Sequence, residues 1–513
     1  MLLHQQFVRM AKKQAEKLAV IDKTTGKNVT YSRALIGALI LSSKFQKYEK
    51  GFIGIMIPTS VGCALATVGA LMSGRIPVMI NYSTGAETNA KYAQKKCKFK
   101  TIITSRALLE KINCPVIDGM VMIEDIMEGV TTGNKLKAAL KSKLPVKMIL
   151  NLIHQGDEND TAVILFTSGS EKDPKAVQLT HRNIASNIEN FGAYVNINES
   201  DILLANLVFF HVFGLTVNLW VAFYYGMTMV SYANPLDFQT ISKIAREEKP
   251  TIMVGTPSFF WGYLQKSDPG DFKTLRLMVA GADKCPDALR EGYMKKHGVT
   301  LLEGYGATET SPVISVNSQE FNRPGSTGKV IPNVMVRIEN FETGEDCKTG
   351  EVGKIMVKGD SVMKGYYDDP ELTAEVLVDG WYNTGDMGFF DEAGYLWHAG
   401  RFKRFTKVGG EMVSLVKVEN ILEKYVPEGV SCCVVEVSDE KKGSYIVATV
   451  SGEVNKTEIL RKMLNELPII ALPRQFIVIK ELPMMSTGKI DFRSVTRIVQ
   501  EIIRDSESDL KSK

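Results

Sequence analysis

The sequence predicts an α/β protein of at least two domains, from its length, its alternating segments and a change of texture near residue 400. A chain of 513 residues is longer than one hydrophobic core usually serves. From residue 51 to 300, short apolar runs alternate with longer helical patterns, which predicts parallel strands joined by helices. We therefore place a domain boundary near residues 400–406.

Strand–helix pairs define the first part of this pattern. Apolar runs at 52–57, 251–255 and 274–281 precede helical patterns at 60–74, 258–266 and 286–297, respectively. From 324 to 400, Gly-rich turns separate short alternating strands, which predicts a smaller β-rich subdomain. Expected strands at 430–439 and 444–452 and an expected helix at 456–467 indicate a small C-terminal domain. The polar sequence after Gln500 predicts a flexible tail.

Two regions, 52–80 and 202–233, approach the ~20 apolar residues of a membrane span. Their embedded Gly, Pro, Asn and His residues favour buried strand–helix units instead. Residues 1–20 lack the uninterrupted apolar run of a signal peptide and predict an amphipathic helix. We expect a cytoplasmic protein, and we leave open a peripheral contact with the inner membrane.

Composition argues against several classes of function. The net charge is only +4, and no basic run is interleaved with aromatic residues, so nucleic-acid binding is not expected. The seven Cys are scattered without a C-x-x-C pair, which predicts reduced thiols. The six His lack the spacing of metal ligands, so a structural zinc is not expected.

The first candidate site is a polar loop that follows an apolar run. Its residues are Thr167, Ser168, Gly169, Ser170 and Lys175. Small residues let backbone N–H groups point at phosphate oxygens, hydroxyls add donors, and the lysine supplies charge. It is not a Walker A loop, because no G-K-[S/T] follows at the right spacing. A polar β-turn with a solvated lysine is the alternative for this loop alone.

A second candidate site begins where an expected strand runs into Gly304-Tyr305-Gly306. The two glycines allow close backbone approach to a flat ligand, on which Tyr305 could stack. The Thr308 hydroxyl could bind a phosphate oxygen, while a carboxylate beside phosphates, here Glu309, usually needs a bridging cation such as Mg²⁺. The alternative is a turn followed by a helix start, where Thr and Glu are common.

A third candidate site lies around Asp386, which we expect in a tight Thr-Gly-Asp turn. A carboxylate there could accept both hydroxyls of a ribose. Arg401 follows, and Gly409-Gly410 forms another expected turn. The basic residues between them are Lys403, Arg404 and Lys407. A β-hairpin with a basic turn is the alternative.

A fourth segment places Lys489 after a glycine in an expected loop, where a lone lysine would usually be solvated. The order and spacing of all four segments, however, resemble the adenylate-forming superfamily of acyl-CoA synthetases, luciferase-like enzymes and peptide-synthetase adenylation domains. The resemblance covers essentially the whole chain. Residues 279–284, 303–317 and 401–419 resemble most closely the ligase domain of bacterial acyl-ACP synthetases, which can be fused to a 2-acylglycerophosphoethanolamine acyltransferase.

This resemblance implies a fold and an activity. The N-terminal adenylation domain, residues 1–402, would hold two α/β sheet subdomains and a small β subdomain. A small mobile α+β domain would span 403–500, before a flexible tail at 501–513. The implied enzyme uses ATP and Mg²⁺ to activate a fatty acid as an acyl-adenylate, then transfers it to a phosphopantetheine thiol. This closer likeness sets holo-ACP slightly ahead of CoA as the expected acceptor, and the basic residues near Arg401 could face an acidic carrier. The same charges could instead meet the 3′-phosphate of CoA.

The resemblance also implies residue roles. The nucleotide would be bound by Thr167, Ser168, Gly169, Ser170, Lys175, Gly304, Tyr305, Gly306, Asp386 and Arg401. The catalytic set would be Lys489 bridging carboxylate and α-phosphate, Thr308 on the α-phosphate, Glu309 holding Mg²⁺, and His211 at the acyl entrance. Arg404 occupies the hinge position, and Gly409 and Gly410 would approach the pantetheine arm. Aromatic residues that could line an acyl tunnel are Phe209, Phe210, Phe213, Trp220, Phe259, Phe260 and Trp261.

Two alternatives stay open at this point. Glu171, Lys172 and Ala176 depart from the usual phosphate loop, which motivates a non-catalytic lipid- or nucleotide-binding descendant. The retained Lys489, Glu309 and Asp386 argue against that reading. Activation of an amino or aryl acid is the other alternative, but the Asp that amino-acid-activating relatives usually carry is absent from residues 205–215.

Overall fold

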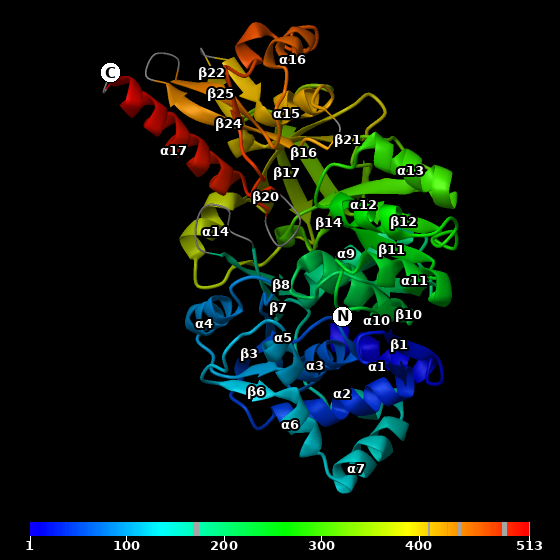
Figure 1. Cartoon of the computed structure of the whole chain (residues 1–513). Coiled ribbons are helices and arrows are strands. Elements are labelled where there is room, and N and C mark those ends of the chain that lie inside the picture. Colours follow the sequence, from blue (N-terminus) through cyan, green and yellow to red (C-terminus); the bar gives the residue numbers. More distant parts are fainter. Residues whose placement is uncertain (168–173, 409–410, 428, 440–442, 485–489, 512–513) are drawn as a thin grey trace.

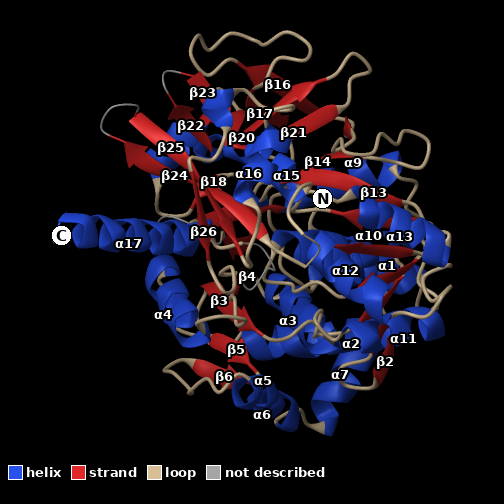
Figure 2. Cartoon of the chain, turned by 45° about the horizontal axis from the view of Figure 1, so that its top comes forward, coloured by secondary structure: helices blue, strands red, loops and turns tan. Residues whose placement is uncertain are grey.

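The computed structural model describes the chain except at residues 168–173, 409–410, 428, 440–442, 485–489 and 512–513. Two large mixed sheets with helices packed on them form the main body, and a smaller unit lies at one end (Figure 1). Figure 2 shows how the helices flank the strands of these sheets. This arrangement confirms the predicted α/β fold class.

The nine-stranded sheet is parallel from β13 through β1 and antiparallel at both edges. In spatial order its strands are β15 (Lys329–Val330), β14 (Val313–Val316), β13 (Leu301–Gly306), β12 (Leu277–Ala280), β11 (Ile252–Gly255), β9 (Ile202–Ala205), β10 (Thr228–Ser231), β1 (Leu18–Asp22) and β2 (Lys27–Thr30). Most of its strands are buried runs, as expected for a parallel sheet covered by helices.

The seven-stranded sheet ends in an antiparallel hairpin. Its spatial order is β18 (Gly365–Tyr366), β8 (Ala176–Thr180), β7 (Thr161–Phe166), β4 (Arg75–Met79), β3 (Gly51–Met56), β5 (Ile102–Thr104) and β6 (Met120–Met122). The hairpin pairs β7 with β8, so the chain turns back across the expected phosphate loop. A further antiparallel sheet contains β16 (Val334–Glu339), β17 (Gly353–Gly359), β19 (Leu377–Val378), β20 (Trp381–Phe390) and β21 (Leu396–Arg401).

Helices connect these strands. They are α1 (Leu3–Lys13), α2 (Tyr31–Phe45), α3 (Val61–Met72), α4 (Ala86–Cys97), α5 (Arg106–Lys111), α6 (Ile123–Glu128), α7 (Thr132–Lys143), α8 (Val146–Asn151), α9 (His181–Tyr194), the π-helix η1 (Phe213–Trp220), α10 (Val221–Tyr225), α11 (Phe238–Glu248), α12 (Pro257–Lys266), α13 (Asp287–His297), the 3-10 turn η2 (Thr308–Thr310) and α14 (Pro370–Val376). Side-chain caps begin several of them: the hydroxyls of Thr30, Ser60 and Thr256 each accept from the backbone N–H three residues later.

Both apolar regions of the sequence form buried strand–helix–strand units. Residues 52–80 contain α3 between β3 and β4, and residues 202–233 contain η1 and α10 between β9 and β10. Gly69 lets α3 approach α2, because a Cβ there would lie 2.9 Å from Leu41 Cβ. In the described part of the chain, no helix has the length and apolar character needed to cross a bilayer.

The C-terminal unit, residues 405–511, has sheets and hydrophobic clusters of its own. Its elements are β22 (Phe405–Val408), β23 (Glu411–Ser414), α15 (Leu415–Glu423), β24 (Cys432–Asp439), β25 (Gly443–Val450), α16 (Lys456–Met463), η4 (Ile469–Ala471), β26 (Gln475–Val478) and α17 (Phe492–Lys511), after the 3-10 turn η3 (Phe402–Arg404). Leu422 and Val434 share one cluster, and Val447 and Val499 share another. Helix α17 continues to Lys511, so the segment expected to be a flexible tail is helical here. Val495 and Val499 pack this helix against the sheet. Its flexibility stays a prediction.

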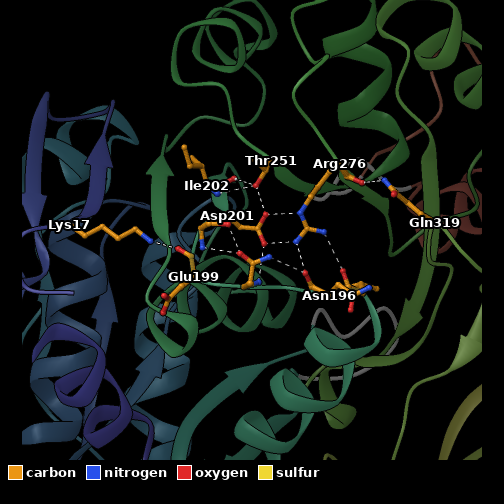
Figure 3. A network of polar contacts seen from close by, with 11 residues as sticks. Lys17, Asn196, Glu199, Asp201, Ile202, Thr251, Arg276 and Gln319 are labelled. Carbon is orange, nitrogen blue, oxygen red and sulfur yellow. Dashed lines mark hydrogen bonds and ion pairs between the residues drawn. The ribbon is translucent and has the colours of Figure 1, made fainter. Parts of the chain in front are cut away.

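A polar network centred on the buried Asp201 ties the nine-stranded sheet together at the amino ends of its strands (Figure 3). Asp201, just before β9, accepts from Arg276 Nε at 2.7 Å and from Thr251 Oγ1 at 2.7 Å. The Arg276 guanidinium also donates to the Asn196 carbonyl at 2.7 Å. Because Thr251 precedes β11 and Arg276 precedes β12, the network fixes three neighbouring strands relative to one another.

Candidate active site

A cavity of about 3920 Å³ lies between the main body and the C-terminal unit. The residues predicted from the sequence that line this cavity are Thr167, Lys175, His211, Gly304, Tyr305, Gly306, Thr308, Glu309, Asp386 and Arg401. Arg404 and, from the C-terminal unit, Phe492 also line it. The structure therefore brings ten of the predicted site residues to one cavity, although they come from segments more than 200 residues apart.

Asp386 is the centre of a polar cluster in this cavity. Its Oδ2 accepts from the Tyr305 hydroxyl at 2.6 Å, and its Oδ1 lies 3.2 Å from Arg401 Nε. His398 Nε2 lies 3.6 Å from the same Oδ1. Asp386 lies within strand β20, not in the tight turn that the sequence predicted. The turn-like sequence instead makes a local irregularity, with Gly385 at φ +72°, inside a strand whose neighbours hold it extended.

The surroundings keep the Asp386 carboxylate ionised. Burial alone would raise its pKa, but hydrogen bonding and charge from His398, the charge of Arg401 and the Tyr305 hydroxyl together lower the pKa below its usual value. Burial, and then the nearby Asp386 charge, raise the pKa of Tyr305, so its hydroxyl stays a donor. A neutral donor and an ionised acceptor thus face each other, and a ligand hydroxyl can enter beside them.

A second polar cluster surrounds Glu309. The Tyr366 hydroxyl donates to Glu309 Oε1 at 2.8 Å, and both side chains are buried. Lys175 Nζ lies 4.9 Å from the centroid of the Tyr366 ring. Tyr366 is thus the link between a carboxylate and a lysine that the sequence placed in separate motifs. Burial and the Glu309 charge raise the pKa of Tyr366, which keeps it a hydrogen-bond donor.

The backbone between these clusters is closely packed. A Cβ on Gly306 would lie 2.0 Å from the Pro312 carbonyl oxygen, so only glycine fits at that end of β13. Gly304 has more room, since its nearest neighbour would be 3.3 Å away. Thr308 begins η2, separated by one residue from the end of β13, and Glu309 follows it in the same turn. The short turn brings both side chains to the cavity.

The stem of the predicted phosphate loop is well defined. Thr167 N–H donates to the Lys175 carbonyl at 3.1 Å, and Lys175 N–H donates to Thr167 Oγ1 at 3.4 Å. These bonds close the loop at its base. Ser168, Gly169 and Ser170, with Glu171 and Lys172, lie outside the described residues, as do Gly409, Gly410 and Lys489.

His211 lies between β9 and η1, where its Nδ1 accepts from the Phe213 N–H at 3.3 Å. Gly214 permits this bend, because a Cβ there would lie 2.1 Å from the Val208 carbonyl oxygen. The aromatic residues expected to line an acyl tunnel divide into two groups. Those that line the cavity are Phe210, Phe213, Phe259 and Trp261. The others, which are buried in the core away from the cavity lining, are Phe209, Trp220 and Phe260.

Arg404, the expected hinge residue, is held by the C-terminal unit. Its guanidinium donates to Glu419 Oε2 at 2.8 Å and to the Val434 carbonyl at 2.6 Å. It also stacks on Phe492 with 3.7 Å between the guanidinium carbon and the ring centroid. Burial raises the pKa of Glu419 in spite of this arginine. Arg404 is therefore bound to residues of the C-terminal unit on three sides.

Two residues of the site escaped the sequence analysis. Tyr366 reaches Glu309 because β18 pairs with β8, a contact between segments without a shared motif. His398 reaches Asp386 because β20 and β21 form a hairpin that pairs Asp386 with Arg401. The second contact had a signal, since alternating residues on both sides of a turn indicate a hairpin.

The carboxylates that line this cavity could hold a Mg²⁺ ion only if a bound ligand supplied further oxygen atoms. Among the described residues, no group of three or more His, Cys, Asp or Glu side chains could hold a metal ion. Glu309 alone, fixed through one oxygen by Tyr366, matches the habit of Mg²⁺ to bind one or two carboxylates together with substrate phosphates.

Comparisons with known proteins identify relatives of the chain. A family model described as "AMP-binding enzyme" matches residues 7–367, and one described as "AMP-binding enzyme C-terminal domain" matches residues 417–489. The chain is 30% identical over 511 residues to a long-chain-fatty-acid–CoA ligase of Bacillus subtilis, covering 91% of this chain and 90% of that protein. It is 32% identical over 346 residues to an indoleacetate–CoA ligase of Aromatoleum aromaticum, covering 66% and 67%. ATP-bound MatB from Rhodopseudomonas palustris matches with a TM-score of 0.83 at 23% identity, over 98% of this chain and 100% of that chain.

Proposed function

Because the chain belongs to the AMP-binding enzyme family of AMP-forming acid–CoA ligases, we propose that it is a long-chain-fatty-acid–CoA ligase. The observation that supports this proposal most directly is the 30% identity with such a ligase over 91% of the chain. The sequence analysis set ACP slightly ahead of CoA as acceptor. The relatives reverse this order, since both curated proteins described above are CoA ligases by name.

The reaction we propose has two steps. One oxygen of the fatty acid carboxylate bonds to the α-phosphorus of ATP, and the bond from that phosphorus to pyrophosphate breaks. The sulfur of CoA, as thiolate, then bonds to the acyl carbon, and AMP leaves with the electron pair of the broken bond. The thiol proton passes to solvent. Both steps bring anions together, so fixed positive charge and hydrogen-bond donors lower their barriers.

We assign the nucleotide to the two polar clusters. Tyr305 offers its ring to the adenine, and its hydroxyl bond to Asp386 fixes the ring plane. The Asp386 carboxylate and Arg401 bind the ribose hydroxyls. Lys175, at the base of the phosphate loop, faces the phosphates, and Thr308 donates to the α-phosphate. A Mg²⁺ ion held by Glu309 would neutralise charge on the phosphates.

We place the acyl chain in the apolar part of the cavity. His211 lies at its start, beside Phe213 and the backbone of Gly281, where a Cβ would lie 3.2 Å from the Phe213 ring. The cavity continues past Leu65 and Leu41. Apolar walls of this kind suit an alkyl chain, because every buried methylene contributes about 0.8 kcal/mol.

We further propose that the C-terminal unit turns about residues 401–403 between the two steps. Arg404 is bound to Glu419, Val434 and Phe492, so the rotation would occur before it and not at it. A variant Arg404→Ala should then weaken the C-terminal unit and slow thioester formation more than adenylation, which separate single-turnover measurements of AMP-ester and thioester would reveal.

The deciding experiment compares acids and acceptors with one enzyme preparation. We expect palmitate to drive release of pyrophosphate, and CoA to yield palmitoyl thioester detected by mass spectrometry. Exclusive use of holo-ACP would restore the first expectation from the sequence. Release driven only by aryl or amino acids would reject a fatty acid as substrate.

The lysine outside the described residues has a test of its own. Lys489→Ala should abolish most adenylation while leaving thioester formation from supplied palmitoyl-adenylate. An unchanged adenylation rate would refute either the assignment of Lys489 or the activity itself, and the parallel acid panel on the unaltered enzyme tells the two apart.

A further inference from the structure

Helices α7 and α8 follow each other directly along the chain and carry both lysines and exposed apolar side chains. Between Gly129 and Gly156 the chain has five lysines and neither Asp nor Glu. We define the basic–apolar surface by Lys135, Lys137, Lys141, Lys143, Lys147, Leu136, Leu140, Met148 and Leu152. Four large apolar side chains in so short a stretch differ from the single exposed residues that any protein surface contains.

Helix α7 buries a small residue and exposes its large apolar ones, the reverse of an ordinary amphipathic helix. Its small Ala138 is buried, while Leu136 and Leu140 are 61% and 59% exposed. At 100° per residue these leucines lie almost opposite Ala138, so they point away from the protein. The following pair, Met148 and Leu152, is 51% and 49% exposed and is again spaced by four residues. A helix that only covered a core would turn its leucines inward.

Lysines from other helices extend the positive charge. Lys12 Nζ of α1 donates to the Ser142 carbonyl at 2.9 Å, near the end of α7. Lys44 Nζ at the end of α2 donates to the Gly129 carbonyl at 2.6 Å, just before α7. The nearest acidic residues along the chain, Glu128 and Asp157, lie outside the segment at either end.

The surface lies close to the apolar part of the cavity. Helix α7 packs on α2, and the α2 residues Gly37 and Leu41 line the cavity. Met127, in the helix before α7, lines the cavity and is 44% exposed. The C-terminal unit lies at the other end of the molecule, as α7 at the bottom of Figure 1 and α16 at its top show. The surface is therefore near the acyl end of the cavity and far from the unit that follows Arg401.

We propose that the basic–apolar surface docks the protein on an anionic lipid bilayer. Leu136 and Leu140 insert among the acyl chains, and the lysines contact phosphate groups of the lipid. Basic amphipathic helices with apolar residues on the contact face bind membranes in this way, and each lysine near an anionic surface adds to the affinity. An acidic carrier protein suits the surface less, because four exposed apolar side chains need an apolar phase and the thiol step is expected near the C-terminal unit.

The test measures co-sedimentation of the full chain with vesicles that contain no fatty acid, so it does not depend on ligase activity. We expect binding to vesicles of phosphatidylglycerol and phosphatidylcholine, weaker binding to phosphatidylcholine alone, and loss of binding at high salt. Leu136→Asn with Leu140→Asn should weaken binding at least about tenfold. Replacement of Lys135, Lys137, Lys143 and Lys147 by Gln should weaken it by about a hundredfold on the anionic vesicles.

Matched controls use helices and loops away from this surface. Met294→Asn on α13 removes an apolar side chain that is 50% exposed. The charge control replaces the exposed residues Lys249, Lys266, Lys273 and Lys295 by Gln. Neither control should change vesicle binding by more than about twofold, and thermal melting should show that all variants fold.

Three outcomes would overturn the proposal. They are absence of binding to anionic vesicles, equal weakening by the controls, and binding that the α7 variants leave intact. If holo-ACP, but no vesicle, binds the chain and the α7 variants abolish that binding, the surface serves a protein partner. If sedimentation instead shows a dimer that Leu136→Asn and Leu140→Asn dissociate, a second copy of the chain covers it.

Discussion

Two buried aspartates pair with arginines in this molecule, and the arginines differ in how they are held. Asp201 and Asp386 are 2% and 4% exposed. The side chain of Arg276, which pairs with Asp201, is 35% exposed and also binds the Asn196 carbonyl. The side chain of Arg401, which pairs with Asp386, is 66% exposed. The Arg276 guanidinium is thus held by backbone carbonyls around it, whereas the Arg401 guanidinium faces the cavity.

The difference shows how one chemical pair serves two purposes. Around Asp201 the partners include Thr251, Arg276 and the Asn198 N–H, which lie in the segments leading into strands β11, β12 and β9. Around Asp386 the partners are side chains that line the cavity, where ligand hydroxyls can exchange with them. A pair whose partners are fixed locks strands together, whereas a pair with a solvent-facing partner remains available for binding.

The largest loss of stability should come from breaking the pair of Asp201 and Arg276. Asp201→Ala leaves Arg276 without its carboxylate, which costs about 3–5 kcal/mol of unfolding free energy for a buried pair. Urea denaturation would measure this loss. The control is Asp268→Ala, which breaks the exposed pair with Arg246 and should cost no more than about 1 kcal/mol. Equal losses for the two variants would mean that the network in Figure 3 does not hold the sheet.

Two buried histidines, His4 on α1 and His181 at the start of α9, differ from both pairs because burial disfavours their charged form. Burial lowers the pKa of His4 to about 4 and that of His181 to about 3. The unfolded chain then binds more protons than the folded chain below pH 6.5, so stability present above that pH is lost as pH falls. For His4 alone the loss between pH 7 and pH 4 is about 3 kcal/mol.

Denaturation curves at the two pH values would check this. The variant His4→Leu should lose about 3 kcal/mol less than the unaltered chain on acidification. If both lose the same free energy, His4 does not remain neutral in the folded protein. The control variant Asp268→Ala keeps His4 and should lose as much free energy on acidification as the unaltered chain.

Breaking the pair of Asp386 and Arg401 should affect ATP binding more than the stability of the fold. Asp386→Asn keeps an acceptor for Tyr305 but removes the charge that pairs with Arg401 and that we propose binds the ribose. A hydrogen bond to a charged group contributes about 1.5–3 kcal/mol, so kcat/KM for ATP should fall by roughly tenfold to a hundredfold. Steady-state release of pyrophosphate measures it. A variant with unchanged kinetics and large loss of stability would make Asp386 a structural residue like Asp201.

The smallest effect concerns the hydroxyl that orients Glu309. Tyr366→Phe removes one donor to a buried carboxylate at a cost of about 1 kcal/mol, or roughly fivefold. We expect the Mg²⁺ concentration for half-maximal activity to rise by that factor. Tyr425→Phe, which removes a hydroxyl bound to Glu466 on the surface, should leave it unchanged. If both variants need the same Mg²⁺ concentration for half-maximal activity, the Tyr366 hydroxyl does not influence Mg²⁺ binding.

Local features of the fold could be predicted from the sequence because near neighbours decide them. The apolar run before Thr167 forms β7, and the run that ends at Gly306 forms β13, as the patterns indicated. Where the pattern was turn-like but the neighbours extended, as at Asp386, the prediction was wrong, since pairing with β21 outweighs the preference of a Thr-Gly-Asp sequence.

The sequence by itself determined the α/β class, the order of the strand–helix units and ten of the residues that line the cavity. Only the tertiary structure decided which of them touch: Tyr366 reaches Glu309 through the pairing of β18 with β8. It also decided that Leu136 and Leu140 point outward, because the facing of a helix depends on what packs against its other side, here Ala138. Contacts between distant segments arise from sheet register and helix packing, which no local pattern records.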